Sequence, residues 1–538
     1  MTKTMKGLSK SRYTQFKQCP KALWLRIYKP EMAVVDEALQ ARFEKGNEVG
    51  DLAMGLLGDF KEVTAFKEDG SLDLQTMIAL TGQYMSEGVT NICEASFSCQ
   101  GGYCAVDILH KTEGGWAIYE VKSTSFPMFN EKPAKLEKYA PDIAYQKWVL
   151  SQCGINVTGT YLVCLNSDYV REGPLDIQQL FVIKDMQTLV ENEYPKVAPL
   201  VSQALKVIND ETEPDIDLSR RCDKPYPCAF FNYCKEQHGV PSPSVFDVYG
   251  GAFGCKKEDS FYITQKLKLY QEGKHSFEDI KDEPLGHIQR LQVEGKEYID
   301  KHGICEFLST LSYPLYFLDF ETMQHPIPQF DRAKPYQQIP FQYSLHIKEM
   351  PDTVVERITD SGRCLKFTKR MAPIHREFLA PNDGSDPRRT LAEQLCRDIP
   401  MDVCVLAYKK NFEKNRIEEL AILYPDLATH LLNIAGNIKD LLDPFQAGYY
   451  YLPAMGGSFS IKSVLPALFP DDPDLDYHNL EGSVHNGGEA MTIFPKIKDM
   501  QPDEAQAARK ALLEYCKLDT WAMVKVWEKL LEAESNYM

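Results

Sequence analysis

The sequence lacks any long apolar segment. No stretch approaches the roughly 18 to 20 consecutive apolar residues that cross a bilayer, and the polar residues 1–16 contain no signal-peptide core. Internal repeats and low-complexity tracts are also missing. We therefore expect a cytoplasmic protein that makes no contact with membranes.

The sequence also lacks an excess of positive charge. Its 60 Lys and Arg residues are outnumbered by 77 Asp and Glu residues, which gives a net charge of −17. This balance disfavours a protein that coats duplex DNA through broad basic surfaces, but it allows a local basic channel beside clustered, metal-binding carboxylates. Hydrophobic residues make up 44% of the 538 residues, enough to form a sizeable core.

The pattern of segments indicates the α/β class and three regions. Residues 1–240 mix amphipathic segments with strand signals and end in a cysteine cluster. Residues 241–305 begin with Pro and Gly and continue as a charged helical run, which predicts a helical connector. Residues 306–538 alternate apolar runs such as LYFLDF and VCVLAY with helical patterns, the rhythm of an α/β domain.

A hairpin is predicted in the first region. Residues 103–110 and 116–125 have strand composition and flank the turn-like sequence TEGG. This pairing places Asp107 opposite Glu120, with Lys122 on the same face. Two opposed carboxylates repel unless a divalent cation binds them, and the ammonium is then free to stabilise developing charge. An exposed hairpin with a charged, solvated face is the alternative interpretation.

The D-x12-E-x-K pattern resembles the PD-(D/E)xK nucleases, in particular their RecB-like branch, which has a restriction-endonuclease-like fold. The resemblance implies that Asp107 and Glu120 bind Mg²⁺ or Mn²⁺. It also implies that Lys122 orients the attacking water or stabilises the transition state, and it makes Gln146 a further catalytic residue.

Two positions depart from that family. Leu150 replaces the Tyr of the Q-x3-Y motif that begins at Gln146, and Gly50 stands where many relatives have a histidine metal ligand. The first domain is therefore expected either to cut nucleic acid or only to hold it.

Four of the fifteen cysteines have an informative spacing. Cys222, Cys228 and Cys234 follow the pattern C-x5-C-x5-C, and Cys19 stands alone near the start. This layout resembles the iron-sulfur RecB-like nucleases, including CRISPR-associated enzymes, and implies a [4Fe-4S] cluster that ties the N-terminal helix to the end of the domain. A structural zinc is the main rival, although zinc sites usually bring C-x2-4-C pairs. Four unrelated buried thiols remain the third interpretation.

The last region carries acidic side chains at strand and helix spacing. Asp319 and Glu321 lie two residues apart on an apolar strand, so they share one face. Burial of two like charges costs several kcal/mol, so either the strand end is open to solvent or a metal is bound. Tyr515 and Asp519 are four residues apart on a predicted helix and share one face. An ordinary strand end and a packed amphipathic helix are the alternative.

These motifs resemble the tyrosine-type DEDD exonucleases, which have a ribonuclease H-like fold. The resemblance implies that Asp319, Glu321 and Asp519 bind two metal ions, and that the Tyr515 hydroxyl positions the attacking water. The second motif is expected within residues 405–420.

The second motif departs from the family pattern. Glu413 replaces its Asp, and Lys409 occupies its Asn position. We carry Glu413 over as a metal ligand and expect Asp440 as a backup carboxylate near the site. Between the second and third motifs, GGSFSIKSVLP at 456–466 could bind phosphate through backbone N–H groups and Lys462, or it could be an ordinary loop and helix N-cap.

The whole chain also resembles an uncharacterised bacterial family that joins a RecB-like, cysteine-clustered domain to a C-terminal block. The sequences FLDFETM, PYQQIPFQYSLHI, GSFSIKSVLP and YCKLDT carry this likeness. The combined expectation is a metal-dependent 3′–5′ exonuclease that releases nucleoside monophosphates, with a second nuclease or strand-binding domain. The substrate expected is nucleic acid, DNA rather than RNA, as single strands or ends. A non-catalytic nucleic-acid-binding or scaffold protein with decayed sites is the alternative.

Overall fold

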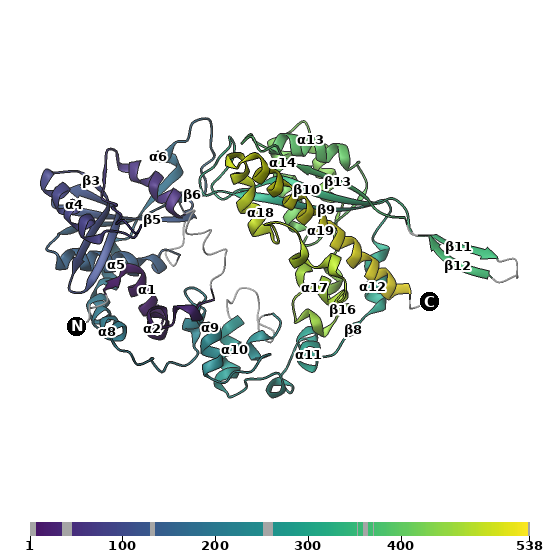
Figure 1. The fold of residues 1–538 in the computed structure, drawn as a ribbon, viewed down its shortest axis with the longest axis horizontal. Coiled ribbons are helices and arrows are strands. Elements are labelled where there is room, and N and C mark those ends of the chain that lie inside the picture. Colours follow the sequence, from purple (N-terminus) through teal and green to yellow (C-terminus); the bar gives the residue numbers. More distant parts are fainter. Residues whose placement is uncertain are drawn as a thin grey trace. The chain divides into compact units, whose positions relative to one another are not determined.

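The computed structural model describes residues 7–34, 46–129, 135–250, 262–351, 353–358, 364–369 and 371–535. The fold is mixed α/β, as expected (Figure 1). The chain divides into two compact units. Unit 1 comprises Met1–Pro241 with His325–Gln337, and unit 2 comprises Ser242–Gln324 with Gln338–Met538. Residues 242–305, expected as a separate connector, therefore group with unit 2.

Unit 1 is built on one mixed sheet. Its strand order is β2-β3-β4-β5-β6-β7, with β1 paired to β4. Strands β5 and β6 are parallel and are joined through helix α5, whereas β3, β4 and β5 are antiparallel neighbours. The strands are β1 Leu8–Ser9, β2 Lys61–Glu62, β3 Asn91–Cys99, β4 Gly102–Thr112, β5 Gly115–Phe126, β6 Val157–Asn166 and β7 Phe181–Asp185.

The helices of unit 1 pack against this sheet and against one another. Helix α1 contacts α2, α5 and α8, and α5 contacts β3 and β4, so the main core lies between α5 and the sheet. The helices are α1 Lys10–Gln18, α2 Pro20–Tyr28, α4 Leu74–Glu87, α5 Ala140–Gln152, α6 Ile177–Leu180, α7 Gln187–Glu193, α8 Val197–Asn209 and α9 Phe231–Gln237.

The predicted hairpin is confirmed. Strands β4 and β5 pair from Ile108↔Tyr119 to Thr112↔Gly115, which is the expected register. Asp107 and Glu120 extend that register by one position, and there the Val121 backbone N–H donates to Asp107 Oδ2 (2.6 Å). Local strand composition and a two-residue turn were sufficient to predict this element.

Unit 2 is built on a second mixed sheet, with the order β13-β10-β9-β14-β15. Strands β9, β10 and β13 are antiparallel, and β14 runs parallel to both β9 and β15. These strands are β9 Leu315–Gln324, β10 Gln338–Lys348, β13 Ile374–Leu379, β14 Cys404–Ala407 and β15 Ile438–Asp440. Two small pairs complete the strands: β11 Thr353–Ile358 with β12 Cys364–Lys369, and β8 Tyr298–Ile299 with β16 Tyr450–Tyr451.

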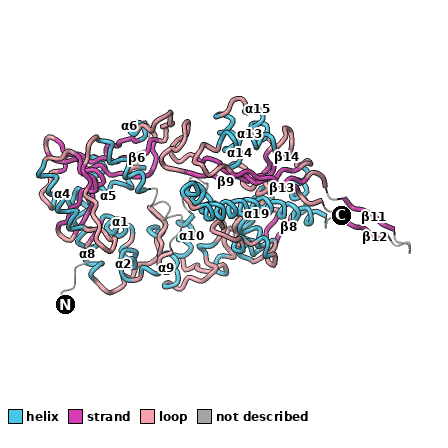
Figure 2. The backbone as a smooth tube through the Cα atoms, turned by 45° about the horizontal axis from the view of Figure 1, so that its top comes forward, coloured by secondary structure: helices cyan, strands magenta, loops and turns pink. Residues whose placement is uncertain are grey.

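Helices cover both faces of this sheet, and Figure 2 shows α13, α14 and α15 on one side of the strands and α19 on the other. On β10, Tyr343 and Leu345 pack with the first group, whereas Ser344 bonds to Thr520 of α19 (2.7 Å). The alternation follows from the two-residue period of a strand. The helices are α10 Tyr262–Gln271, α11 His287–Glu294, α12 Lys301–Ser309, α13 Arg388–Asp398, α14 Asn411–Leu423, α15 Ala428–Gly436, α16 Asp443–Gln446, α17 Ile461–Leu468, α18 Gly487–Ile493 and α19 Pro502–Ser535.

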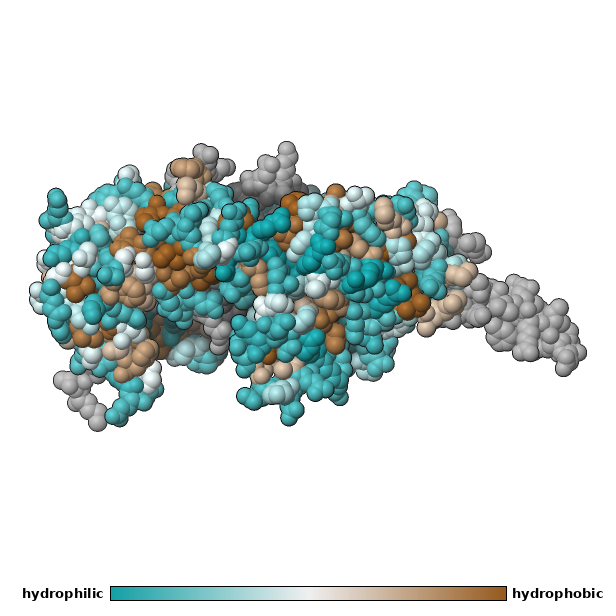
Figure 3. Space-filling model, turned by 90° about the horizontal axis from the view of Figure 1, so that it is seen from above, coloured by the Kyte–Doolittle hydropathy of each residue, from teal (hydrophilic) through white to brown (hydrophobic). Residues whose placement is uncertain are grey.

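One face of the surface is drawn by hydropathy in Figure 3. Figure 3 shows a largely hydrophilic face, with apolar side chains gathered mainly over unit 1. Phe66 of that unit is 66% exposed and Leu72 is 46% exposed. Within the described ranges, no helix combines the length and the apolar character needed to cross a bilayer.

Candidate functional site

The first candidate site lies in unit 2 between β9 and α19. Asp319 and Glu321 are paired across the sheet with Ser344 and Gln342, so both carboxylates point to the face that α19 covers. Asp519 comes from the middle of α19. One carboxylate oxygen from each of the three residues lies within 4.8 Å of the other two. The first and third predicted motifs therefore converge in space.

Glu321 and Asp519 are buried and Asp319 is partly buried, and none of the three has an ion-pair partner among the described residues. Glu321 is 6% exposed and Asp519 is 8% exposed. No lysine, arginine or histidine in the described part of the chain forms an ion pair with any of the three. Burial, together with the charge of Asp519, raises the pKa of Asp319 and of Glu321 well above the usual range. Burial also raises the pKa of Asp519 to about 6. A divalent cation would relieve this repulsion.

Glu413 is a fourth buried carboxylate near the cluster. It lies in the first turn of α14, is 2% exposed, and its Oε2 has no hydrogen-bond partner. Burial and then the charge of Asp440 raise its pKa to about 8. Its charge also raises the pKa of Asp319 and Glu321, although no Glu413 oxygen falls within the 4.8 Å group. The residue predicted from the second motif thus lies beside the cluster.

The carboxylate of Asp440, by contrast with that of Glu413, is hydrogen-bonded to the backbone. Its oxygens accept the backbone N–H groups of Lys409 (2.9 Å), Lys410 (3.0 Å) and Leu442 (3.1 Å). These bonds hold the turn from β14 into α14, in which Lys409 adopts a left-handed φ of 66°. Asp440 therefore supports the site through the backbone.

Two tyrosines contact Asp519. The Tyr477 hydroxyl donates to Asp519 Oδ1 (2.6 Å), and a hydrogen bond from Tyr515 also lowers the pKa of Asp519. Burial, followed by the charge of Asp519, raises the pKa of both phenols, so both stay protonated. The motif predicted Tyr515. Tyr477 was missed, because it lies 42 residues from Asp519 in the short 3-10 turn Tyr477–Asn479 and belongs to no recognised spacing.

A cavity of about 220 Å³ opens beside the carboxylates. Asp319 and Asp519 line it together with Lys409 and Lys462. The Lys462 ammonium lies 5.1 Å from the ring centroid of Tyr477 and 5.5 Å from that of Tyr515. Lys462, the lysine that the sequence suggested for phosphate binding, therefore lines the same cavity as Asp319 and Asp519.

The residue before α17 bears on the other interpretation of residues 456–466. Ser460 occupies the N-cap position, but its hydroxyl bonds to the Ser463 hydroxyl (3.0 Å) and caps no backbone N–H. The interpretation as a loop and a helix N-cap therefore holds for the position of Ser460, while its side chain makes no capping bond among the described residues.

The second candidate site lies in unit 1 on β5. Glu120 is fully buried, and its Oε1 accepts the Lys122 ammonium (2.6 Å) while its Oε2 accepts the Gln146 amide (2.6 Å). Lys122 also contacts Asp142 (3.1 Å). The structure therefore brings together Asp107, Glu120, Lys122 and Gln146, as the motif predicted.

Lys10 is an additional member of this site that the motif did not predict. Its Nζ donates to both Glu120 oxygens (2.8 and 3.0 Å) and lies 3.9 Å from Asp107 Oδ1. Burial opposes the ionisation of Glu120, but the charges of Lys10 and Lys122 outweigh it and lower the pKa to about 2. Burial and the charge of Glu120 raise the pKa of Asp107 to about 6.

Glu94 is a further acidic neighbour. The β3–β4 ladder skips both Glu94 and Asp107 without a change of register, and Glu94 has a left-handed φ of 56°, so the pairing is locally distorted there. Burial and the charge of Asp107 raise the pKa of Glu94 to about 7. Only the tertiary fold reveals this distortion, since no local pattern marks it.

The two departures from the family occupy different surroundings. Leu150 lies on α5 and is fully buried in the core. Gly50 lies in the helical residues 46–53, and an added Cβ would meet no atom within 4 Å. Neither side chain has an atom that could bind a metal held by Asp107 and Glu120.

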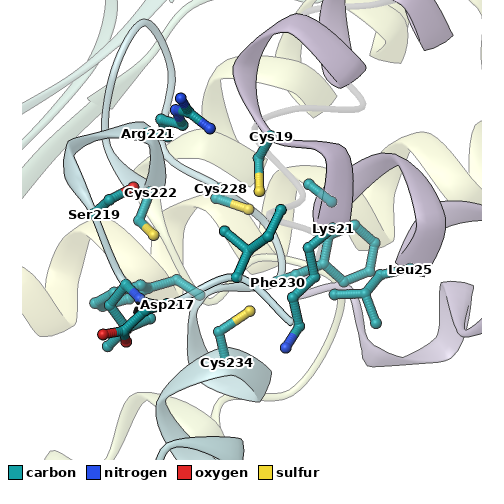
Figure 4. A pocket seen from close by; sticks show the side chains of 14 residues that line it. Cys19, Lys21, Leu25, Asp217, Ser219, Arg221, Cys222, Cys228, Phe230 and Cys234 are labelled. Carbon is teal, nitrogen blue, oxygen red and sulfur yellow. Dashed lines mark hydrogen bonds between the residues drawn. The ribbon is translucent and has the colours of Figure 1, made fainter. Parts of the chain in front are cut away.

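The four cysteines with the informative spacing line one pocket of unit 1 (Figure 4). Cys19 joins α1 to α2, Cys222 ends the 3-10 turn Arg220–Cys222, and Cys234 lies in α9. Gln18 Nε2 ties α1 to this loop by donating to the carbonyl oxygens of residues 221 (2.8 Å) and 226 (2.7 Å). The start and the end of unit 1 therefore meet at these thiols.

The donor set of this pocket suits a metal centre. Burial raises the pKa of Cys222 and Cys228, and raises that of Cys234 to about 12, so these thiols are protonated at neutral pH and a metal would have to replace the protons. Within the described residues, no three of these sulfur atoms come within 4.8 Å of one another. A single tetrahedral zinc would hold its sulfurs about 3.8 Å apart.

Comparison with known proteins gives a partial match. The family described as "Domain of unknown function (DUF2779)" matches residues 316–460. This segment runs from β9 to the residue before α17, so it contains Asp319, Glu321 and Glu413. It ends before Lys462, the two tyrosines of the site and Asp519.

Two relatives come from mycoplasmas. The "Uncharacterized protein MG366 homolog" of Mycoplasma pneumoniae is 24% identical over 276 residues, which cover 48% of this chain and 39% of that protein. The "Uncharacterized protein MG366" of Mycoplasma genitalium is 20% identical over 404 residues, 69% of this chain and 58% of the relative. The matched part thus spans less than two thirds of either relative, and neither description states an activity.

Proposed function

We propose that this protein is a metal-dependent nuclease whose active site is the carboxylate cluster of unit 2, and that it hydrolyses phosphodiester bonds from the 3′ end of a nucleic acid strand. The observation that carries the proposal is the convergence of Asp319, Glu321 and Asp519 from β9 and α19. Asp319 is partly buried, the other two are buried, and none forms an ion pair among the described residues. The proposed substrate is DNA rather than RNA, as single strands or ends.

The donor set fits Mg²⁺ or Mn²⁺, because both prefer carboxylate oxygens. Asp319, Glu321 and Asp519 would hold the metal, and the unpartnered Oε2 of Glu413 makes it the candidate fourth ligand. When bound, a pair of such ions polarises the phosphodiester and lowers the pKa of the attacking water.

The side chains around the cluster have separate roles in this proposal. The Tyr515 hydroxyl stays protonated and orients water, and the Tyr477 hydroxyl holds Asp519 in place. Lys462 lines the cavity beside Asp319 and Asp519, where an ammonium neutralises the charge that develops on a transferring phosphoryl group.

The finer fold assignments are also proposals. We assign unit 2 a ribonuclease H-like fold and unit 1 a restriction-endonuclease-like fold. The first assignment is supported by the positions of the motifs: Asp319 and Glu321 on β9, Glu413 after β14, and Asp519 on a helix. The second is supported by the hairpin of β4 and β5, which carries Asp107, Glu120 and Lys122.

The nuclease proposal is tested with end-labelled single strands of DNA and RNA in Mn²⁺ or Mg²⁺. We expect wild type to release mononucleotides from the 3′ end, and we expect Asp319→Asn and Asp519→Asn to reduce this release to background. Glu514→Gln is the matched control, because Glu514 lies on α19 and pairs with Lys510 outside the cluster (3.4 Å). If Asp319→Asn and wild type behave identically, the proposal is wrong.

We further propose a [4Fe-4S] cluster at Cys19, Cys222, Cys228 and Cys234. Two observations support this cluster. The four thiols line one pocket, and among the described residues their sulfur atoms lie farther apart than the ligands of a single zinc ion do. Anaerobically purified protein should be brown and contain iron and sulfide. Cys228→Ser should lose both, whereas the matched control Cys305→Ser, at an exposed cysteine of unit 2, should keep them. Colourless protein with stoichiometric zinc would contradict the cluster.

A further inference from the structure

We propose that Lys10 is the resident cation of the acidic site in unit 1 and that it keeps divalent metal away from Asp107 and Glu120. The resemblance of the hairpin to metal-dependent nucleases implies the opposite, so the contacts of Lys10 are decisive. The inference concerns metal binding in unit 1 and does not depend on the nuclease activity proposed for unit 2.

The position of the Lys10 ammonium is that of a bridging metal ion. Its Nζ contacts both oxygens of Glu120 (2.8 and 3.0 Å) and approaches Asp107 Oδ1 (3.9 Å). A divalent cation shared by these two carboxylates would have to contact the same oxygens. The ammonium and the metal therefore compete for one place.

The remaining contacts of Glu120 leave no free side for a metal. Lys122 donates to Oε1 (2.6 Å) and Gln146 donates to Oε2 (2.6 Å), in addition to the two bonds from Lys10. A cation that entered beside Lys10 would lie within a few Å of two ammonium groups, and like charges at that separation repel strongly in a buried site. Metal can enter only if Lys10 leaves.

The acidic sites of unit 1 and unit 2 differ in whether lysines pair with their carboxylates. In unit 1 the carboxylates of Asp107, Glu120 and Asp142 face the ammonium groups of Lys10 and Lys122. In unit 2 the clustered carboxylates have no ion pair within the described residues. Buried charges need compensation. In unit 1 lysine supplies it for Glu120, while Asp107 and the neighbouring Glu94 keep raised pKa values. In unit 2 a metal is needed to supply it.

The fold holds the backbone of Lys10 in place. Strand β1 pairs with β4 directly before Lys10, through Leu8↔Gly102 and Ser9↔Tyr103. The Tyr145 hydroxyl donates to the Leu8 carbonyl oxygen. The side chain of Lys10 is nevertheless 24% exposed, so it can swing towards solvent when a competing cation is abundant. Exclusion of metal is therefore competitive, and its strength is measurable as a change in affinity.

The test measures Mn²⁺ binding by electron paramagnetic resonance and calorimetry in a background in which Asp319→Asn and Asp519→Asn remove the unit 2 site. With Mn²⁺ stoichiometric to the protein, we expect this background protein to bind no Mn²⁺ that Glu120→Gln releases. Glu120-dependent binding of Mn²⁺ at that ratio in the presence of Lys10 would overturn the proposal. This first comparison requires no substitution of Lys10.

The second comparison replaces Lys10. Lys10→Met should create one Mn²⁺ site per chain, with an affinity at least roughly tenfold higher than in the background, and Glu120→Gln should abolish it. Lys10→Gln, which keeps a hydrogen-bonding side chain, serves if the methionine variant does not fold. Lys17→Met is the matched control, because Lys17 lies on the same helix and pairs with Glu193. If neither Lys10 variant gains a site, Lys10 does not exclude metal and the proposal fails.

Metal binding also distinguishes this proposal from the nuclease proposal. A Mn²⁺ site gained in Lys10→Met would support the role of Lys10 even if the wild-type protein released no nucleotides. Nuclease activity lost in Asp319→Asn would support unit 2 as the active site even if Lys10→Met gained no metal.

Discussion

Glu120 and Asp519 are both buried carboxylates, yet their neighbours shift their pKa values in opposite directions. Two ammonium groups lower the pKa of Glu120 to about 2, whereas burial among carboxylates raises that of Asp519 to about 6. Residue type alone therefore does not distinguish a metal ligand from the partner of a lysine. The nearest charges decide which role each carboxylate can take.

The Tyr477 hydroxyl is the residue-scale contact that most directly stabilises the ionised form of Asp519. Tyr477→Phe removes the hydrogen bond to Oδ1 but keeps the ring that lies under Lys462. We expect the Mn²⁺ affinity to fall by roughly 10- to 100-fold, because loss of a hydrogen-bond partner of a metal ligand typically has an effect of that size. Calorimetric titration checks this, with Tyr298→Phe at a half-exposed tyrosine as the control. An unchanged affinity would remove Tyr477 from the site.

At the scale of elements, the turn between β14 and α14 depends on a strand that follows it in the sequence. Asp440 of β15 accepts three backbone N–H groups, two of them from the turn that precedes α14. This turn carries Lys409 with its left-handed φ and leads to Glu413. Asp440 thus acts by holding the backbone of the turn that leads to Glu413.

Substitution of Asp440 should therefore lower stability more than metal affinity. Asp440→Ala leaves buried N–H groups unpaired, which costs about 1 to 3 kcal/mol. Asp440→Asn keeps one acceptor and should retain part of that stability. Denaturant unfolding measures the first effect, and Mn²⁺ titration of the folded protein should give an affinity within about twofold of wild type, as expected for a side chain that binds no metal. A large loss of affinity with unchanged stability would make Asp440 a ligand after all.

At the scale of the whole molecule, Glu120 of unit 1 and the clustered carboxylates of unit 2 contribute to stability with opposite dependence on pH. In unit 2 the folded-state pKa values of Glu413 (about 8) and Asp519 (about 6) lie above their unfolded values. The stability that these groups contribute is complete below about pH 4 and is lost as pH rises through 6 to 8. In unit 1 the lowered pKa of Glu120 contributes stability at neutral pH that is lost as pH falls from about 4.5 towards 2.

Metal should therefore stabilise unit 2 more at pH 8 than at pH 6. Deprotonated carboxylates bind Mn²⁺ better, and metal at 100 times its Kd adds about 2.7 kcal/mol. This corresponds to a rise in Tm of roughly 5 to 10 °C. Calorimetry with Mn²⁺ or with a chelator at both pH values measures the shift. The double variant Asp319→Asn, Asp519→Asn should show none, and a larger shift at pH 6 would contradict the predicted sign.

Much of the secondary structure around the candidate sites was predictable from local patterns. The register of β4 and β5 followed from strand composition and a short turn. The shared face of Asp319 and Glu321 followed from the period of a strand, and that of Tyr515 and Asp519 from the period of a helix. The divergent second motif was expected within residues 405–420, and the structure places its Glu413 in the first turn of α14.

The sequence by itself thus determined the mixed α/β class, the hairpin of unit 1 and the local spacing of the carboxylates, because each depends on residues a few positions apart. Only the tertiary structure decided which groups surround those carboxylates. Lys10 reaches Glu120 across 110 residues, and Tyr477 reaches Asp519 across 42. Asp440 turned out to hold a backbone turn. Such contacts are set by how sheets and helices pack together, and no local period records them.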